Sequence, residues 1–199
     1  MGKAETTKQA IIEKAAVIFN KNGYQRTSMS TLTRALGLTK GAIYGNFADK
    51  DELAVEAFRY SFQQVHARIS GALRPHQGAL AKLRVLAGSF LEVYEETVQG
   101  GGCPILNTAV DSDDAHPLLF QEVRRALAAW EREIVRLVEL GKSTGEIRLD
   151  ADAGLFAANF IALVEGGILL AKTLCEKRYL EHSVAGINLF IRQMLEVDE

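Results

Sequence analysis

Few side chains in this sequence combine the types and the spacing that catalysis or metal binding requires. The run from Gly141 to Thr144 matches the end of a phosphate-binding loop, but the glycine needed five residues earlier is Arg136. The four histidines have no metal-ligand spacing with one another or with the two cysteines. The polar loop from Asp111 to His116 is typical of a solvated turn and helix cap. These patterns predict no catalytic residue, no metal site, no cofactor and no enzymatic activity.

Cys103 occupies a position that favours thiolate chemistry. It follows Gly100–Gly102 and precedes Pro104, which opens a predicted helix. The partial positive charge at a helix N-terminus stabilises a thiolate. Two interpretations stay open, a sensor of oxidants or electrophiles and a small buried residue. Cys103 and Cys175 lie far apart without paired spacing, which indicates a reducing compartment rather than a disulfide scaffold.

Charge is divided unevenly along the chain, although the formal net charge of the 199 residues is only −2. Residues 1–50 contain eight Lys and Arg residues against three Asp and Glu residues, whereas the remainder contains 15 against 22. A basic head on an acidic body confines a nucleic-acid footprint to one end of the molecule. No stretch of 18 apolar residues lacks a polar interruption, so we expect no membrane-spanning segment.

Two short helices joined by a tight turn are predicted within residues 27–50. In the first, apolar residues recur at positions 29, 32 and 36, which is helical spacing. Thr27 or Ser28 supplies the N-cap oxygen, and Gly37 ends the helix because it adopts the left-handed conformation without a Cβ penalty.

The second short helix has a buried side and a bare, basic side. Thr39 is its predicted N-cap, and Ile43 lies on the inward face. Lys40 and Tyr44 share an outer face four residues apart, and Gly41 lacks a side chain there. A helix backbone without side chains lets another backbone approach closely, and we expect a DNA phosphate backbone in that place.

These residues resemble the N-terminal domain of TetR-family transcriptional regulators. The resemblance covers about residues 5–60. Gly45 stands where a larger, often aromatic, side chain is usual and Asn46 where histidine is usual, so the operator sequence does not follow by analogy. The matching residues are Gly23-Tyr24, Thr27-Ser28-Met29, Ala35-Leu36-Gly37-Leu38, Thr39-Lys40-Gly41, Tyr44, Phe47 and Asp49-Lys50.

The resemblance implies that the second helix enters the major groove of double-stranded DNA. We expect phosphate contacts from the polar side chains of this helix and base contacts near its start. The predicted DNA-binding residues are Thr27, Ser28, Arg34, Thr39, Lys40, Gly41, Tyr44, Asn46 and Lys50.

Long helical patterns dominate the rest of the chain, and prolines number only three. The predicted fold is all-α, with about nine helices. A helix-turn-helix DNA-binding domain of three helices spans residues 1–50, and an effector-binding and dimerisation domain spans residues 51–199. Among the later helices, we expect long ones over residues 79–98, 117–141, 152–175 and 180–197.

The helix expected over residues 152–175 is apolar around most of its circumference, so it needs cover on all sides. A chain of this size does not supply that cover alone, and the resemblance implies a four-helix interface between two subunits. The alternative is a central core helix of a monomer. The predicted dimer contacts are Ala162, Gly166, Leu170, Ile187, Phe190 and Met194.

An effector site is expected among the helices between residues 79 and 175, although the same residues would also suit a plain core. Asn107 and Asn159 stand out because an amide on an apolar face needs hydrogen-bond partners. A lining of this composition suits a small, largely apolar molecule. The predicted effector residues are Phe90, Tyr94, Cys103, Leu106, Asn107, Leu127, Trp130, Phe156, Asn159 and Phe160.

The sequence therefore predicts a cytoplasmic, homodimeric repressor that a small effector releases from a pseudo-palindromic operator. The alternative is a helical small-molecule-binding or scaffolding protein with a vestigial helix-turn-helix, which Gly45 favours. The effector, the operator and the direction of regulation do not follow from the sequence.

Overall fold

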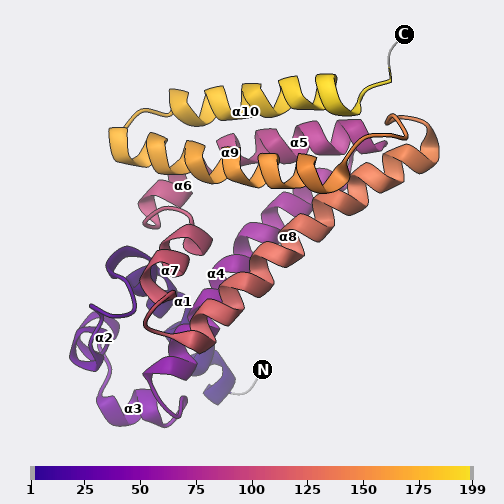
Figure 1. Ribbon diagram of the computed structural model, residues 1–199. Helices are drawn as coiled ribbons and strands as arrows, with labels where there is room; N and C mark the ends of the chain where they lie inside the picture. Colours follow the sequence, from indigo (N-terminus) through magenta and orange to yellow (C-terminus); the bar gives the residue numbers. More distant parts are fainter. Residues whose placement is uncertain (1–2, 198–199) are drawn as a thin grey trace. The chain divides into compact units, whose positions relative to one another are not determined.

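The computed structural model describes residues 3–197 and is all-α, as predicted (Figure 1). Within these residues the only pairing of the β type is a single antiparallel bridge between Ile147 and Glu196. The elements are α1 (Lys3–Asn22), α2 (Met29–Leu36), α3 (Lys40–Tyr44), α4 (Lys50–Leu73), α5 (Ala79–Glu92), α6 (Tyr94–Gln99), α7 (Pro104–Ser112), α8 (Pro117–Thr144), α9 (Ala153–Leu174), α10 (Arg178–Phe190) and a π-helical turn, η1 (Ile191–Leu195).

The segment expected as one helix over residues 79–98 forms two helices, α5 and α6. The chain leaves helical geometry at Val93, whose φ is −89° and ψ is 2°. Tyr94 begins α6, and its buried hydroxyl donates to the carbonyl of Ala171 in α9 over 3.2 Å. Apolar residues keep their helical spacing on both sides of Val93, so periodicity carried no signal of the break.

The described residues form two compact units. The first contains the chain up to Val65 together with Gly100–Ala126, and the second contains His66–Gln99 and the chain from Leu127 onward. The long helices α4 and α8 each contribute to both units, and α7 belongs to the first. The predicted boundary at residue 50 separates the chain by function and not by packing. It stays a prediction.

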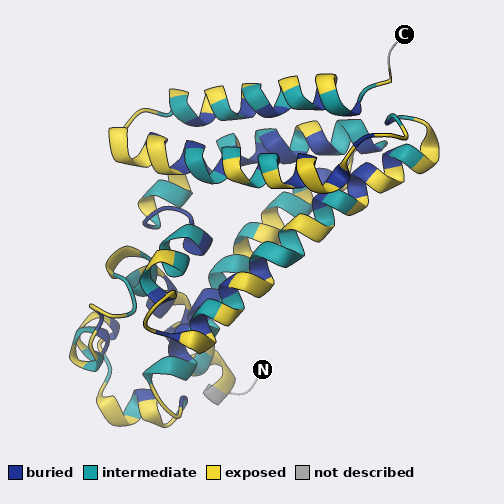
Figure 2. Cartoon of the chain, in the orientation of Figure 1, coloured by how far each residue is buried: buried dark blue, intermediate teal, exposed yellow. Residues whose placement is uncertain are grey.

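One apolar cluster holds α1, α2, α3 and the start of α4 together in the first unit (Figure 2). Hydrophobic burial of this kind drives the packing of such short helices, because helices of five and eight residues are not stable alone. The buried members are Ile11, Ile12, Ala15, Ala16, Leu32, Leu36, Ile43, Phe47, Leu53 and Ala57.

An ion pair joins α4 to α8 within the first unit. Arg59 Nε and Nη2 donate to the two carboxylate oxygens of Glu122, each over 3.0 Å. The hydrogen bond from Arg59 lowers the pKa of Glu122 below its usual value. The pair therefore stabilises the fold above the ordinary pKa of glutamic acid, and that contribution is lost as the pH falls through the lowered value.

Helix α9 lies within the range expected for it, residues 152–175, and it is strongly apolar. Its 22 residues include a window of mean hydropathy 1.8, so by length and composition it is capable of crossing a membrane. Length and mean hydropathy alone do not contradict the expectation that the chain has no membrane-spanning segment, which stays a prediction. A core helix of a soluble protein passes the same test, and 39% of the window is buried.

Candidate nucleic-acid interface

The two predicted helix caps are present at the helix-turn-helix. Ser28, and not Thr27, caps α2 by accepting a hydrogen bond from the N–H of Thr31 over 3.1 Å. Gly37 ends α2 in the left-handed conformation, with φ of 66°. Thr39 caps α3 by accepting from the N–H of Ala42 over 3.2 Å. These caps fix where each helix begins and ends, and hence which side chains face outward.

Four of the predicted contact residues form an open surface on α3. Thr39, Lys40 and Gly41 are exposed, and Tyr44 retains 48% of its accessible surface. A Cβ added at Gly41 would meet only Thr39 Oγ1, at 3.9 Å, so the backbone is open to a close approach there. Arg34, also exposed, lies in the last turn of α2. This surface offers a cation, hydroxyl groups and bare backbone, which are groups that bind DNA phosphates.

Thr27 does not belong to that surface. Its side chain is fully buried, and its hydroxyl donates to the carbonyl of Gly23 over 2.6 Å. The predicted DNA contact by this side chain is therefore corrected: Thr27 stabilises the turn between α1 and α2. The sequence left Thr27 and Ser28 as equivalent caps because both side chains carry a hydroxyl group.

Lys50 and Asn46 make hydrogen bonds inside the first unit. The ammonium of Lys50 donates to the carbonyls of Tyr24 and Thr27, each over 3.1 Å, and lies 3.9 Å from the centre of the Tyr24 ring. The amide of Asn46 donates to the carbonyl of Ala42 over 2.9 Å. Both residues therefore stabilise the first unit through these hydrogen bonds. Their predicted contacts with phosphates depend on the N–H groups that these bonds do not use.

Tyr24 and His116 are parts of this region that motif analysis did not single out as functional. The Tyr24 hydroxyl donates to the carboxylate of Asp51, and burial followed by this hydrogen bond raises the pKa of Tyr24. His116 Nε2 lies 3.3 Å from Asp51 Oδ2, and His116 Nδ1 caps α8 by accepting from the N–H of Leu119 over 3.0 Å. The predicted helix cap after the polar loop is thereby confirmed. No local pattern linked residues so far apart in the sequence.

Four of the predicted effector residues pack together as aromatic rings in the second unit. Phe90 lies 5.4 Å from Trp130 and 6.4 Å from Phe160 between ring centres, and Phe156 lies 6.1 Å from Phe160. Tyr94, of the same unit, is buried. Leu127 is partly buried. The four aromatic rings form a cluster that an apolar ligand would have to enter by displacing or repacking them.

The other predicted effector residues are placed differently. Asn159 donates its amide to the carbonyl of Leu155, one turn earlier on the solvent side of α9. Cys103, Leu106 and Asn107 belong to the first unit, where Cys103 is a buried N-cap of α7. The prediction therefore drew on residues of two compact units, because residue type alone carries no information on which unit holds it.

The predicted dimer residues fall mainly on the outer sides of α9 and α10. Ala162 and Leu170 are exposed, and a Cβ added at Gly166 would meet nothing within 4 Å. Phe190 and Met194 are partly buried.

Ile187 is a correction to this set, because its side chain is 0% exposed within its own unit. The close approach of α9 to α10 depends on Gly167, where an added Cβ would lie 2.6 Å from Ser183 Oγ.

The fold and this surface define an all-α helix-turn-helix protein with a separate helical unit. Two family models match the chain: residues 11–57 match the bacterial regulatory proteins of the tetR family, and residues 79–187 match the tetracyclin repressor-like C-terminal domain. The chain belongs to the TetR family of DNA-binding transcriptional regulators, which are not enzymes.

Individual relatives agree with this family. A TetR transcriptional regulator from Chloroflexus aurantiacus J-10-FL is 36% identical, with a TM-score of 0.90 and full coverage of both chains. A TetR-family regulator from Cytophaga hutchinsonii is 31% identical, with a TM-score of 0.88 over 100% of this chain and 99% of that one. The HTH-type transcriptional repressor DhaR of Mycobacterium sp. (strain GP1) is 27% identical over 83% of this chain and 82% of its own length.

Proposed function

We propose that this regulator is a homodimeric repressor that binds a pseudo-palindromic DNA operator and is released by a small, largely apolar effector. The observation that carries the proposal is the open surface of α3, where Thr39, Lys40, Gly41 and Tyr44 are exposed side by side on a capped helix. A short helix with a bare backbone and one cation fits the phosphates that flank a major groove. The related protein DhaR is a repressor, which supports the direction of control.

The dimer part of the proposal is supported by the unburied apolar side of α9. Leu155 is 53% exposed and Leu170 46% exposed, and Ala162 and Gly166 lie between them on the same side of the helix. A stripe of leucine, alanine and glycine costs free energy when it faces water, and its small residues let a second helix approach closely. Two copies of one chain related by a two-fold axis would present two copies of α3 to a two-fold operator.

The effector part of the proposal is supported by the aromatic cluster of Phe90, Trp130, Phe156 and Phe160. Rings of this kind bind apolar molecules by burial and offer few hydrogen bonds. An effector acts only by its difference in affinity between the DNA-binding state and the released state. We place the working protein in the cytoplasm, where it meets both DNA and small metabolites.

Selection of bound duplex fragments from the source genome is the experiment that tests this function. The expected result is a set of fragments sharing an inverted repeat. A salt titration on mixed-sequence duplex DNA separates the alternative of a vestigial helix-turn-helix, which the missing side chain at Gly45 favours. A regulator loses affinity steeply as salt rises, whereas a flat response and no enriched repeat would support the alternative.

Replacing Lys40 by alanine should weaken binding to every duplex sequence and reduce the salt slope by about one counterion. The physical reason is that an exposed ammonium at the start of α3 contacts phosphate rather than a base edge. Affinity measured against salt concentration, by fluorescence anisotropy, checks it. Lys142→Ala, which removes an ion pair with Glu139 in the second unit, is the control and should leave the slope unchanged. A changed sequence preference in Lys40→Ala would contradict the phosphate assignment.

Apolar compounds that release the protein from DNA should shift or quench the emission of Trp130, the only tryptophan. The reason is its ring contacts with Phe90 and Phe160, which a ligand entering the cluster must disturb. Fluorescence titration alongside a DNA-release assay measures both. If Cys103 senses instead, thiol reagents should release the protein while Trp130 emission stays unchanged, and Cys103→Ser should abolish that release.

A further inference from the structure

The turn between α1 and α2 is held at every polar group of its Tyr24. The N–H of Tyr24 donates to Asp111 Oδ2 over 2.5 Å, and its carbonyl accepts from the ammonium of Lys50 over 3.1 Å. Its hydroxyl donates to Asp51. Lys50 and Asp51 begin α4 and so are sequence neighbours of the helix-turn-helix. Asp111 comes from α7, 87 residues further along the chain.

Asp111 fits against this turn closely. Its Oδ2 also accepts from the N–H of Gln25, over 3.4 Å. A Cβ added at Gly23 would lie 2.8 Å from Asp111 Oδ1, so the carboxylate fills the space that a side chain at position 23 would need. Gly23 also has a φ of 80°, which disfavours other residues. The glycine and the carboxylate are therefore matched to each other.

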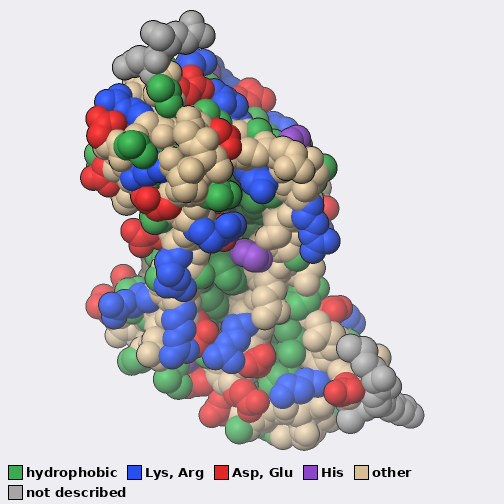
Figure 3. All heavy atoms as spheres, turned by 90° about the vertical axis from the view of Figure 1, so that its right-hand side faces the viewer, with side chains coloured by type: hydrophobic (Ala, Val, Ile, Leu, Met, Phe, Trp, Pro, Cys, Tyr) green, Lys and Arg blue, Asp and Glu red, His purple; other side chains and the backbone are tan. Residues whose placement is uncertain are grey.

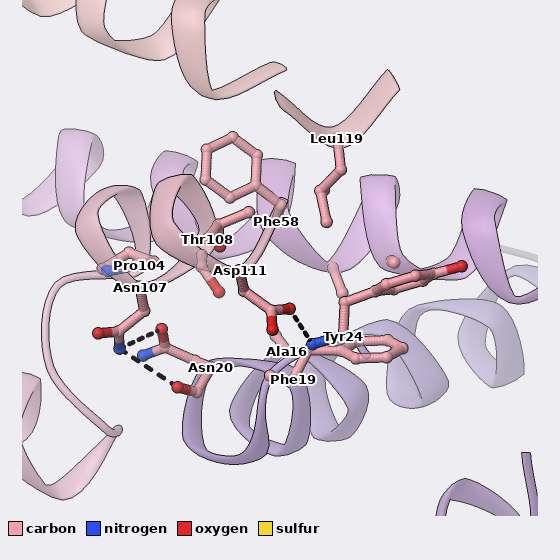
Figure 4. A pocket seen from close by; sticks show the side chains of 14 residues that line it. Ala16, Phe19, Asn20, Tyr24, Phe58, Pro104, Asn107, Thr108, Asp111 and Leu119 are labelled. Carbon is pink, nitrogen blue, oxygen red and sulfur yellow. Dashed lines mark hydrogen bonds between the residues drawn. The ribbon is translucent and has the colours of Figure 1, made fainter. Parts of the chain in front are cut away.

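A second set of contacts lies one turn away along α7. The amide of Asn107 donates to the carbonyl of Asn20 over 3.2 Å and to its Oδ1 over 3.0 Å. Asn20 in turn donates to the carbonyls of Gly100 and Gly102, over 2.8 and 3.0 Å. Figure 4 shows both asparagines turned toward each other from α1 and α7. The backbone of Gly100 and Gly102 is thus bonded to the end of α1.

The space enclosed by these residues is too small for an effector. The cavity lined by Asn20, Tyr24, Asn107 and Asp111 has a volume of about 20 Å³, room for one water molecule. These polar groups therefore join α1 to α7 directly, and they do not enclose a ligand.

We propose that Asp111, assisted by Asn107, is a positioning residue for DNA binding, and that α7 acts as a latch on the turn between α1 and α2. The apolar cluster holds α2 and α3 on α1, but hydrophobic burial is non-directional. Hydrogen bonds to Tyr24 and Gln25 supply the directional restraint immediately before the start of α2. The placement of Ser28, Arg34 and the α3 surface then depends on a helix that lies far away in the sequence. The inference rests on the proposed function, since it concerns affinity for DNA.

The test compares full-length wild type with Asp111→Ala, Asp111→Asn and Asp114→Ala. Asp114, exposed in the turn that follows α7, provides the same change of charge as a matched control. Binding to a selected genomic fragment and to a mixed-sequence duplex is measured well below the melting temperature of each variant. Hydrogen exchange at the amides of Tyr24 and Gln25 reports the latch directly, and it is independent of DNA.

Asp111→Ala should exchange these two amides faster and bind the selected fragment on the order of 10-fold more weakly, with a smaller ratio of selected to mixed-sequence affinity. Asp111→Asn keeps an acceptor oxygen and should stay within about threefold of wild type. Asp114→Ala should match wild type or bind slightly better, because it only removes a negative charge.

Three results would overturn the proposal. Unchanged exchange in Asp111→Ala would mean that the latch does not form in solution. Faster exchange with affinities equal to those of Asp114→Ala would mean that it forms without positioning the DNA-binding surface. Failure of the wild type to bind either duplex at low salt would refute the proposed function, and the positioning role with it, whatever the amides show.

Discussion

Replacing Gly166 by aspartate should convert the protein to monomers at micromolar concentration and abolish operator binding together. In one chain the position is open, since an added Cβ meets nothing within 4 Å, so the variant should fold. In the proposed dimer the new carboxylate would lie in an apolar interface without a partner, and burying an unpaired charge costs several kcal/mol. Sedimentation and DNA-binding measurements on the same samples check both effects.

Gly71→Asp is the matched control for this prediction. Gly71 is an exposed glycine of α4 with nothing within 4 Å of an added Cβ, so the same side chain enters an open helix surface. It should leave the dimer and the DNA affinity unchanged. If Gly166→Asp remained dimeric, the interface would have to lie elsewhere than on this side of α9. A wild type that sediments as a monomer would remove the dimer from the proposal altogether.

Replacing Gly141 by alanine should lower the free energy of unfolding by about 3 kcal/mol, at the upper end of what overpacking costs. An added Cβ would lie 2.5 Å from Cδ1 of Ile147 and 2.8 Å from Cβ of Ala79. Both neighbours are fully buried, so neither moves aside without disturbing the packing of α5 and α8. Urea denaturation at a fixed protein concentration measures the change, since dimerisation makes apparent stability depend on concentration.

Gly88→Ala gives the opposite expectation for the same substitution in the same compact unit. Gly88 lies inside α5, and an added Cβ meets nothing within 4 Å. Alanine is favoured over glycine in a helix, so the free energy of unfolding should rise by about 0.5–1 kcal/mol. If both substitutions lowered the free energy of unfolding equally, then helix propensity and the contacts of the added methyl group would not decide the outcome at these sites.

Local chemistry allowed much of the DNA-binding region to be predicted. The structure contains the cap at Thr39, the left-handed Gly37 and the inward Ile43. Each of these features depends on residues no more than about one helical turn away. The all-α class follows from helical periodicity in the same way. The motif around Lys40 indicated the family, which the family models and relatives then showed.

Other features depend on contacts between distant residues and left no local signal. The sequence offered Ile187 as a dimer contact, but only the packing of α10 shows that this side chain is fully buried within one chain. Gly166 and Gly167 are adjacent and identical in type, yet only Gly167 lies against Ser183. In these cases residue type does not tell whether a position is exposed or buried, because that depends on which positions the neighbouring helix covers.

The sequence by itself determined that this chain is helical, that its basic end carries a helix-turn-helix and that its family is the TetR family. The tertiary structure decided what the polar residues around that motif do. Lys50, assigned to phosphate from its place in the motif, donates to carbonyls of Tyr24 and Thr27. Asp111, assigned to a solvated loop, accepts from the turn 87 residues before it. A hydrogen bond depends on where two atoms meet in space, and for residues so far apart only the folded chain fixes that place.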